Sequence, residues 1–183
     1  MRSLTTLVAF KVCWLAIVLG AVWSMEWAGL LAIAAFTAYE VGVRSRTHLL
    51  IPALVVGLVG YGVDNAYVAT GLMSFSDPGI ALAPYWMALL WVNFALIVEH
   101  GLAWLNGRPL LAAALGAIGG PMAYFAGVRF ELITLIAPTP MVMGVIALTW
   151  AAAMPLLIRF LGAGSDTATH DALTEPGLTA QRF

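Results

Sequence analysis

Six apolar segments, each about as long as a bilayer's hydrocarbon core is thick, constrain this chain more than any other feature. They cover residues 5–23, 27–43, 49–70, 84–105, 109–128 and 140–161. An α-helix rises about 1.5 Å per residue, so about 20 apolar residues cross the roughly 30 Å of hydrocarbon. Three segments begin at Pro84, Pro109 and Pro140, where a missing N–H removes no helical hydrogen bond. The pattern predicts an all-α fold, a polytopic membrane bundle of six transmembrane helices.

The composition agrees with a membrane protein. Hydrophobic residues make up 62% of the 183 residues and charged residues only 9%, whereas about a quarter of a typical soluble domain is charged. The formal net charge of −1 argues against nucleic acid as a partner, because nucleic-acid binding needs a basic face. Cys13 is the single cysteine, which excludes an internal disulfide and a cysteine-based zinc or iron–sulfur site.

The arginines predict the orientation of the bundle. If the N-terminus is cytoplasmic, six arginines fall on the cytoplasmic side: Arg2, Arg44, Arg46, Arg108, Arg159 and Arg182. Only Arg129 lies near the other face, which is the positive-inside pattern. We therefore expect both termini in the cytoplasm and the chain in the bacterial inner (plasma) membrane. The transmembrane domain should span residues 1–162, and the polar residues 163–183 should form a disordered cytoplasmic tail.

The fourth segment is apolar almost throughout but contains Asn93, Glu99 and His100. Polar side chains at membrane depth normally face other helices, a cavity or water. We therefore expect the other segments to pack around this one. Asn93 should lie near the middle of the bilayer, and Glu99 and His100 near its cytoplasmic side.

Two interpretations apply to Glu99 and His100. Together with Lys11, a carboxylate and an imidazole can form a proton-transfer or metal-binding group. Metal binding is the weaker form of this hypothesis, since one imidazole with scattered carboxylates is a poor ligand set. In the alternative, Lys11 only neutralises Glu40 or Glu99 near the headgroups.

Asp64 follows an apolar, glycine-rich run at residues 55–63 and is expected toward the outer side. An ionised carboxylate at that depth needs a partner, and Arg129 is the strong cation predicted on the same side. Asp64 and Arg129 can form a structural or headgroup-binding pair. Alternatively, Asp64 is protonated and serves as an acid.

The fifth segment carries small residues at helical spacing, namely Ala112, Gly116 and Gly120. Such stripes let two helix backbones approach closely, so we expect them to pack against a neighbouring helix. Pro121 follows the stripe and should kink this helix. A kink that lines a cavity is the second interpretation of the same residues.

Three pieces of the sequence, residues 62–75, 84–105 and 115–127, together resemble a family of bacterial integral membrane proteins described as domain of unknown function 2878. The resemblance covers roughly residues 5 to 160. It implies that the shared positions matter, and these are Asp64, His100, Trp104, Gly120, Pro121 and Tyr124. The family pattern commonly has an Asn before the His, whereas this chain has Glu99. It also has a Gly-Ala pair where Phe130 and Glu131 stand here.

The polar positions lead to a functional hypothesis. We expect an intramembrane pocket between the third, fourth and fifth segments that binds or modifies a lipid or other apolar small molecule. The candidate catalytic residues are His100, Glu99 and Asp64, and the candidate ligand-binding residues are Asn93, Trp104, Tyr124 and Arg129. The sequence indicates no metal site, identifies no cofactor and leaves enzymatic activity open.

Two other classes of function remain open. The first is a small proton-coupled transporter that uses Asp64 and Glu99 in turn. The second is a non-catalytic subunit or assembly factor of a membrane complex, whose polar residues only lock helices together. Membrane lipid is the expected partner, and a homo-oligomer or another membrane protein is compatible with the sequence.

Overall fold

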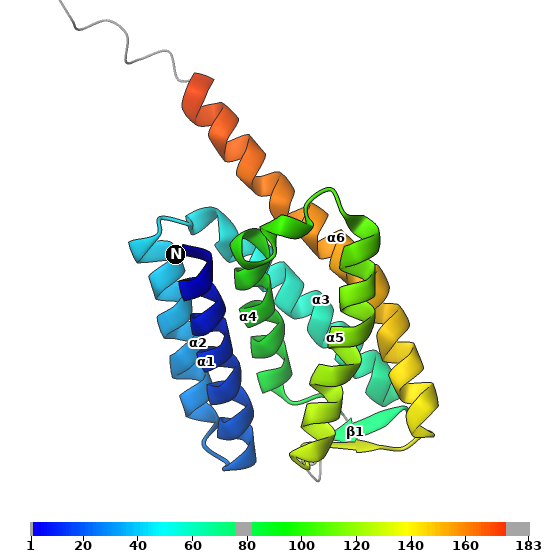
Figure 1. Cartoon of the computed structure of the whole chain (residues 1–183). Coiled ribbons are helices and arrows are strands. Elements are labelled where there is room, and N and C mark those ends of the chain that lie inside the picture. Colours follow the sequence, from blue (N-terminus) through cyan, green and yellow to red (C-terminus); the bar gives the residue numbers. More distant parts are fainter. Residues whose placement is uncertain (1, 76–81, 175–183) are drawn as a thin grey trace, which may run out of the picture.

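The computed structural model describes residues 2–75 and 82–174, with side chains at 5–75, 82–98 and 101–162. Successive long helices run in alternating directions, and two short strands join loops at the end of the bundle away from the N-terminus (Figure 1). The helices are α1 Arg2–Val22, α2 Glu26–Ala38, α3 Leu50–Ala69, α4 Tyr85–Gly101, α5 Pro109–Arg129 and α6 Thr139–Thr174. Short π- and 3-10 elements are η1 Tyr39–Val43, η2 Thr47–Leu49 and η3 Ala103–Leu105, and the strands are β1 Met73–Phe75 and β2 Ile133–Leu135. The prediction of an all-α fold is confirmed.

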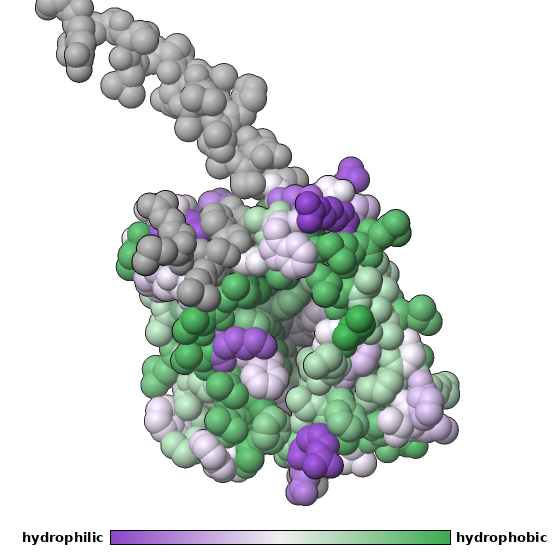
Figure 2. Space-filling view, viewed as in Figure 1, coloured by the Kyte–Doolittle hydropathy of each residue, from purple (hydrophilic) through white to green (hydrophobic). Residues whose placement is uncertain are grey.

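Five of the helical segments are long and apolar enough to cross a membrane. They are Thr5–Val22, Glu26–Val43, Thr47–Ala69, Pro109–Arg129 and Thr139–Gly162. The shorter apolar helix α4 has 17 residues and begins after Pro84, as its sequence predicts. Apolar side chains cover much of the visible face of the bundle (Figure 2). The chain is a multi-pass membrane protein.

Helix α4 lies at the centre of the bundle and packs against α1, α2, α3 and α6. Four of the five other long helices thus gather around residues 84–105, as expected, and α5 is the exception. Helix α5 packs mainly on α6, and α1 packs mainly on α2 and α4. The bundle is therefore built around α4. Helix α1 contacts α4 directly, whereas α5 is attached to the bundle mainly through α6.

The two strands were not predicted. Met73 pairs with Leu135 and Phe75 with Ile133 in an antiparallel register. Each strand has only three residues, which is too short for an alternating pattern to stand out in the sequence. The pairing ties the loop after α3 to the loop after α5.

Helix α6 continues to Thr174 and so includes residues 163–174, for which we predicted disorder. The remaining residues, 175–183, lie outside the described part of the chain. The helix passes through Pro155, and α5 likewise passes through Pro121.

Close packing of α5 on α6 confirms the interpretation of the small-residue stripe. Ala112, Gly116 and Gly120 are all buried. A Cβ atom added at Gly116 would stand 2.2 Å from the backbone oxygen of Trp150, and one added at Gly120 would stand 2.4 Å from the Trp150 ring. The two glycines thus set the distance between the helices.

This packing predicts that Gly116→Ala destabilises the bundle by about 2 kcal/mol, because the new methyl group meets backbone that cannot move aside cheaply. The melting temperature should fall by roughly 5 °C. Cys13 is buried and is the single cysteine, so its reaction with a thiol-reactive dye reports unfolding in detergent. Gly119→Ala on the same helix is the matched control, since nothing lies within 4 Å of its added Cβ. Equal melting of the two variants would contradict the packing role.

A buried ion-pair cluster closes the loop between α2 and α3. The Glu40 side chain is 0% exposed and lies 3.3 Å from Arg44 Nη1, and Arg46 binds its second oxygen. Arg44 also donates a hydrogen bond to Thr6 on α1. The suggested pairing of Lys11 with Glu40 is therefore wrong, because two arginines of the following loop already neutralise this carboxylate.

Candidate functional site

Asp64 lies on α3 and is 0% exposed. Trp91 Nε1 on α4 donates a hydrogen bond to Asp64 Oδ2 at 2.9 Å, and the Tyr124 hydroxyl on α5 donates one to Oδ1. The carboxylate thus joins three helices through two neutral donors. Asp64 forms no pair with Arg129, which is exposed at the end of α5, so the hypothesis of an Asp64–Arg129 pair is wrong.

The local sequence explains why Asp64 faces the interior. Buried residues of α3 recur every three or four residues, with Val56 and Gly57 adjacent at one turn: Ala53, Val56, Gly57, Gly60, Asp64 and Tyr67. Residues at these spacings share one face of a helix. A Cβ atom added at Gly60 would lie 2.0 Å from the Trp91 ring, so this glycine lets the indole approach the α3 backbone beside Asp64.

Aromatic rings surround the buried carboxylate. Trp91 stacks on Trp150 of α6 with a centroid separation of 4.6 Å and an interplanar angle of 12°. Phe94 meets Trp150 edge to face at 5.3 Å, and Tyr67 meets Tyr124 in the same way at 5.8 Å. The hydrogen bond from Trp91 to Asp64 therefore holds one ring of the Trp91–Trp150 stack in place and links α3 to α6 through α4.

Beyond this stack lies an open groove of about 390 Å³ between α1 and α5. Figure 2, viewed as in Figure 1, shows the face of the bundle hollowed between these helices. Its lining residues come from α1, α4, α5 and α6: Phe10, Lys11, Trp14, Leu90, Phe94, Leu115, Gly116, Gly119, Gly120, Met122, Ala123, Ala126, Trp150 and Met154. The groove opens on the side of the bundle (Figure 2), and all of its lining helices except α4 are long enough to cross a membrane.

A smaller cavity of about 70 Å³ adjoins the groove, and the two share Trp14, Leu90, Ala123 and Trp150. Trp91 and Tyr124 also line this cavity. The two donors that hold Asp64 thus form the inner wall of a space that opens to the side of the bundle. Asp64 itself lies behind that wall.

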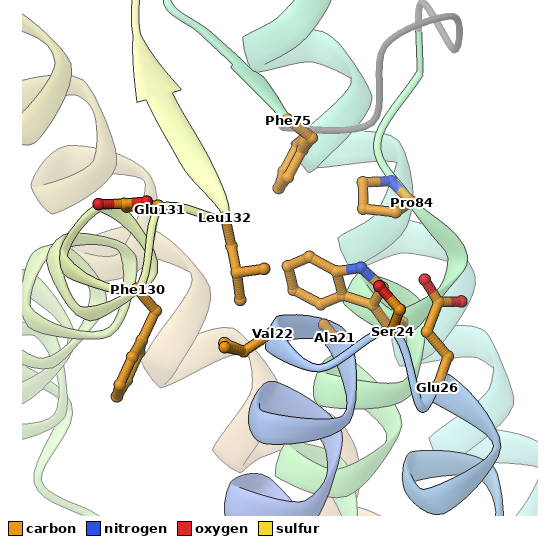
Figure 3. Close-up of a pocket in the computed structure, with 10 residues that line it drawn as sticks. Ala21, Val22, Ser24, Glu26, Phe75, Pro84, Phe130, Glu131 and Leu132 are labelled. Carbon is orange, nitrogen blue, oxygen red and sulfur yellow. The ribbon is translucent and has the colours of Figure 1, made fainter.

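A third cavity, of about 510 Å³, lies at the strand end of the bundle. Leu132 lines both this cavity and the smaller one. Figure 3 shows Leu132 and Phe75 pointing toward its middle, with Glu26 on one side and Glu131 on the other. The groove, the smaller cavity and this end cavity therefore follow one another along α1 and α5.

Lys11 is exposed at the groove and is the one charged residue among those that line it. Its ammonium group lies 5.6 Å from the centre of the Phe10 ring and 5.9 Å from that of Trp14. These are cation–π distances. Within the described side chains, Lys11 contacts aromatic rings and forms no ion pair.

The structure brings together two of the predicted site residues, Asp64 and Tyr124. Asn93 is buried between α4 and α1, where its side-chain N–H donates to the Phe10 carbonyl oxygen at 3.3 Å, while its own oxygen has no partner among the described residues. Trp104 is 52% exposed in η3, away from the site.

Glu99 and His100 belong to α4, but their side chains lie outside the described residues. Their assignment as catalytic residues stays a prediction. In the part of the chain whose side chains are described, no three His, Cys, Asp or Glu residues lie close enough together to hold a metal ion.

Sequence reasoning missed Trp91 and Trp150 as site residues, because a tryptophan within an apolar segment is as typical of core packing as of a site. It considered Lys11 only beside Glu99 and His100 or as a partner of Glu40 or Glu99, and so missed its place at the groove. The signal that could have found Trp91 is the spacing of Gly57, Gly60 and Asp64, which leaves room for a large ring beside a carboxylate.

Comparison with known proteins supplies the family. No curated protein and no solved structure matches the chain. The profile of the family described as "Protein of unknown function (DUF2878)" matches residues 3–156. The match covers α2, α3, α4 and α5 completely, together with α1 from its second residue and the first part of α6. The chain therefore belongs to this family, as the resemblance of its three sequence pieces predicted.

Proposed function

We propose that this protein binds a lipid or other apolar small molecule in the groove between α1 and α5. The observation that carries the proposal is the sideways opening of a groove of about 390 Å³ lined by half-buried aromatic rings. Small-molecule sites are typically apolar clefts of about 300–1,000 Å³ with a few polar groups. A molecule dissolved in the bilayer can enter such a site without crossing water.

The groove of this proposal differs from the pocket that the sequence led us to expect. We placed the pocket between the third, fourth and fifth segments, but α3 contributes no lining residue. Asp64 instead supports the wall through Trp91 and Tyr124. In this proposal Asp64 is a positioning residue, because it acts through the two rings that face the cavity.

The proposal includes a topology with six crossings and both termini on the cytoplasmic side of a bacterial inner membrane. Helix α4 is about 25 Å long at 1.5 Å per residue, which is close to the hydrocarbon thickness. Successive helices alternate in direction (Figure 1). Arg44, Arg46, Arg108 and Arg159 all belong to the end of the bundle where the N-terminus lies, as the positive-inside rule requires.

Filling the groove tests the proposal. Gly119 lines the groove, and nothing lies within 4 Å of a Cβ atom added there. Gly119→Leu should therefore occupy the groove without disturbing the helices. We expect the lipid that co-purifies with the protein, measured by mass spectrometry, to fall by roughly tenfold.

The matched control is Gly144→Leu on α6. Gly144 is exposed, has nothing within 4 Å of its added Cβ and does not line the groove. It should retain the lipid of the unmodified protein. Equal lipid content in both variants would show that the groove is not the binding site. If Gly119→Leu instead releases a co-purifying protein, the groove binds a helix of that partner. This result would favour the hypothesis that the chain is a non-catalytic subunit of a membrane complex.

A further inference from the structure

Lys11 stands near the middle of a membrane-spanning helix. It is six residues after Thr5 and eleven before Val22, the two ends of the apolar span, so at 1.5 Å per residue it lies about 9 Å from the nearer end. A lysine near a helix end can extend its side chain to the interface, but this one is too deep to do so fully. A charged side chain at this depth is costly, so its presence calls for a role other than keeping the protein soluble.

The surroundings of Lys11 are selective for one kind of partner. Its ammonium group rests on the Phe10 and Trp14 rings, which are neutral, and it faces a groove whose other lining residues are uncharged. Polar and ionisable groups inside a membrane commonly mark a ligand or ion pathway. The groove therefore offers a long apolar surface with one positive charge beside it.

We propose that the occupant of the groove is a single-chain amphiphile whose carboxylate pairs with Lys11 and whose hydrocarbon chain lies along Gly119 and Trp150. This inference rests on the proposed function and adds the chemical class of the ligand. Three features of the groove support the choice.

The first feature is charge, because one ammonium group balances one anionic group. The second is depth, because a fatty carboxylate brings no polar atoms besides its two oxygens to this level, whereas a phospholipid headgroup would also bury its phosphodiester, ester and alcohol groups. The third is size. A volume of about 390 Å³ lies at the lower end of the range of small-molecule sites, which suits one chain better than the two chains of a phospholipid.

A pair of probes with the same chain tests the assignment. Palmitate and cetyl alcohol differ at the head, which is a carboxylate in one and an uncharged hydroxyl in the other. Their binding to the purified full-length protein in a non-ionic detergent is measured by isothermal titration calorimetry. We expect palmitate to bind about tenfold more tightly than cetyl alcohol, since a partly desolvated ion pair contributes a factor of this order.

Lys11→Gln should remove this preference and leave the binding of cetyl alcohol within about twofold of the unmodified protein, whereas Lys11→Arg should retain the preference. Gly119→Leu should weaken both probes by roughly tenfold, because it fills the space for the chain. Thiol labelling of Cys13 on heating confirms that each variant is folded, which separates lost binding from lost structure.

The outcomes separate the two levels of the proposal. If neither probe binds the unmodified protein, or if Gly119→Leu binds both as well as before, the groove is not a lipid site and the proposed function fails. If both probes bind and Gly119→Leu excludes them, but Lys11→Gln keeps the preference for palmitate, only the pairing with Lys11 is wrong. If dipalmitoyl phosphatidylglycerol binds the unmodified protein more tightly than palmitate, the single-chain assignment is wrong.

Discussion

Glu40→Ala should lower the stability of the bundle by about 3–5 kcal/mol, the range measured when one partner of a buried ion pair is removed. Glu40 is fully buried, and Arg46 retains only 8% of its side-chain exposure. Without the carboxylate, the buried Arg46 guanidinium loses its ion pair with Glu40. Heating the protein in detergent and following dye labelling of Cys13 measures the loss.

Two further variants separate charge from packing at Glu40. Glu40→Gln keeps the size and an oxygen acceptor, so it should lose less stability than Glu40→Ala. The double variant Glu40→Leu with Arg46→Met replaces the pair by apolar side chains and should regain most of the stability. A double variant that is no more stable than Glu40→Ala would mean that the pair is not what holds the α2–α3 loop.

Asp64→Ala is expected to cost on the order of 3 kcal/mol. It removes the acceptor for both Trp91 Nε1 and the Tyr124 hydroxyl, and each buried donor left without a partner costs about 1–3 kcal/mol. Because both rings line the inner cavity, the variant should also lose co-purified lipid. Melting by Cys13 labelling and mass spectrometry of bound lipid measure the two effects.

Asp64→Asn is the matched control for this prediction. It keeps the volume of the side chain and one oxygen acceptor, so its loss of stability should be roughly 1 kcal/mol. Trp91→Phe removes one donor but leaves Tyr124 bound to Asp64. If Asp64→Ala melts like the unmodified protein and retains its lipid, then Asp64 does not position the groove wall.

The helices could be predicted from the sequence because their signal is local. The predicted segments 109–128 and 140–161 agree with α5 and with the membrane-spanning part of α6 to within one residue at each end. The stripe of small residues correctly indicated a close helix contact, since small side chains let the backbone of a neighbouring helix approach; its members are Ala112, Gly116 and Gly120. The β1–β2 pairing could not be predicted, because it joins residues far apart in the chain through three-residue strands.

The site was only partly predictable. Asp64 stood out because a carboxylate within an apolar segment is costly, and Tyr124 followed from the family resemblance. The partner chosen for Asp64 was wrong, because charge favours Arg129 whereas the interior face of α3 is turned toward Trp91 and Tyr124. The charged residues of the α2–α3 loop served as markers of orientation, and their pairing with Glu40 went unrecognised.

The sequence by itself determined that this chain is a multi-pass membrane protein of helices. The length and polarity of a segment show whether it can cross the hydrocarbon, and a segment that crosses must be helical because a helix pairs its backbone groups internally. Only the tertiary structure decided which polar groups meet and where the groove opens. Those outcomes depend on how each helix is rotated about its axis and on which neighbour it packs against. Gly60, Gly116 and Gly120 influence both, because they let the rings and backbone of the adjacent helices approach closely.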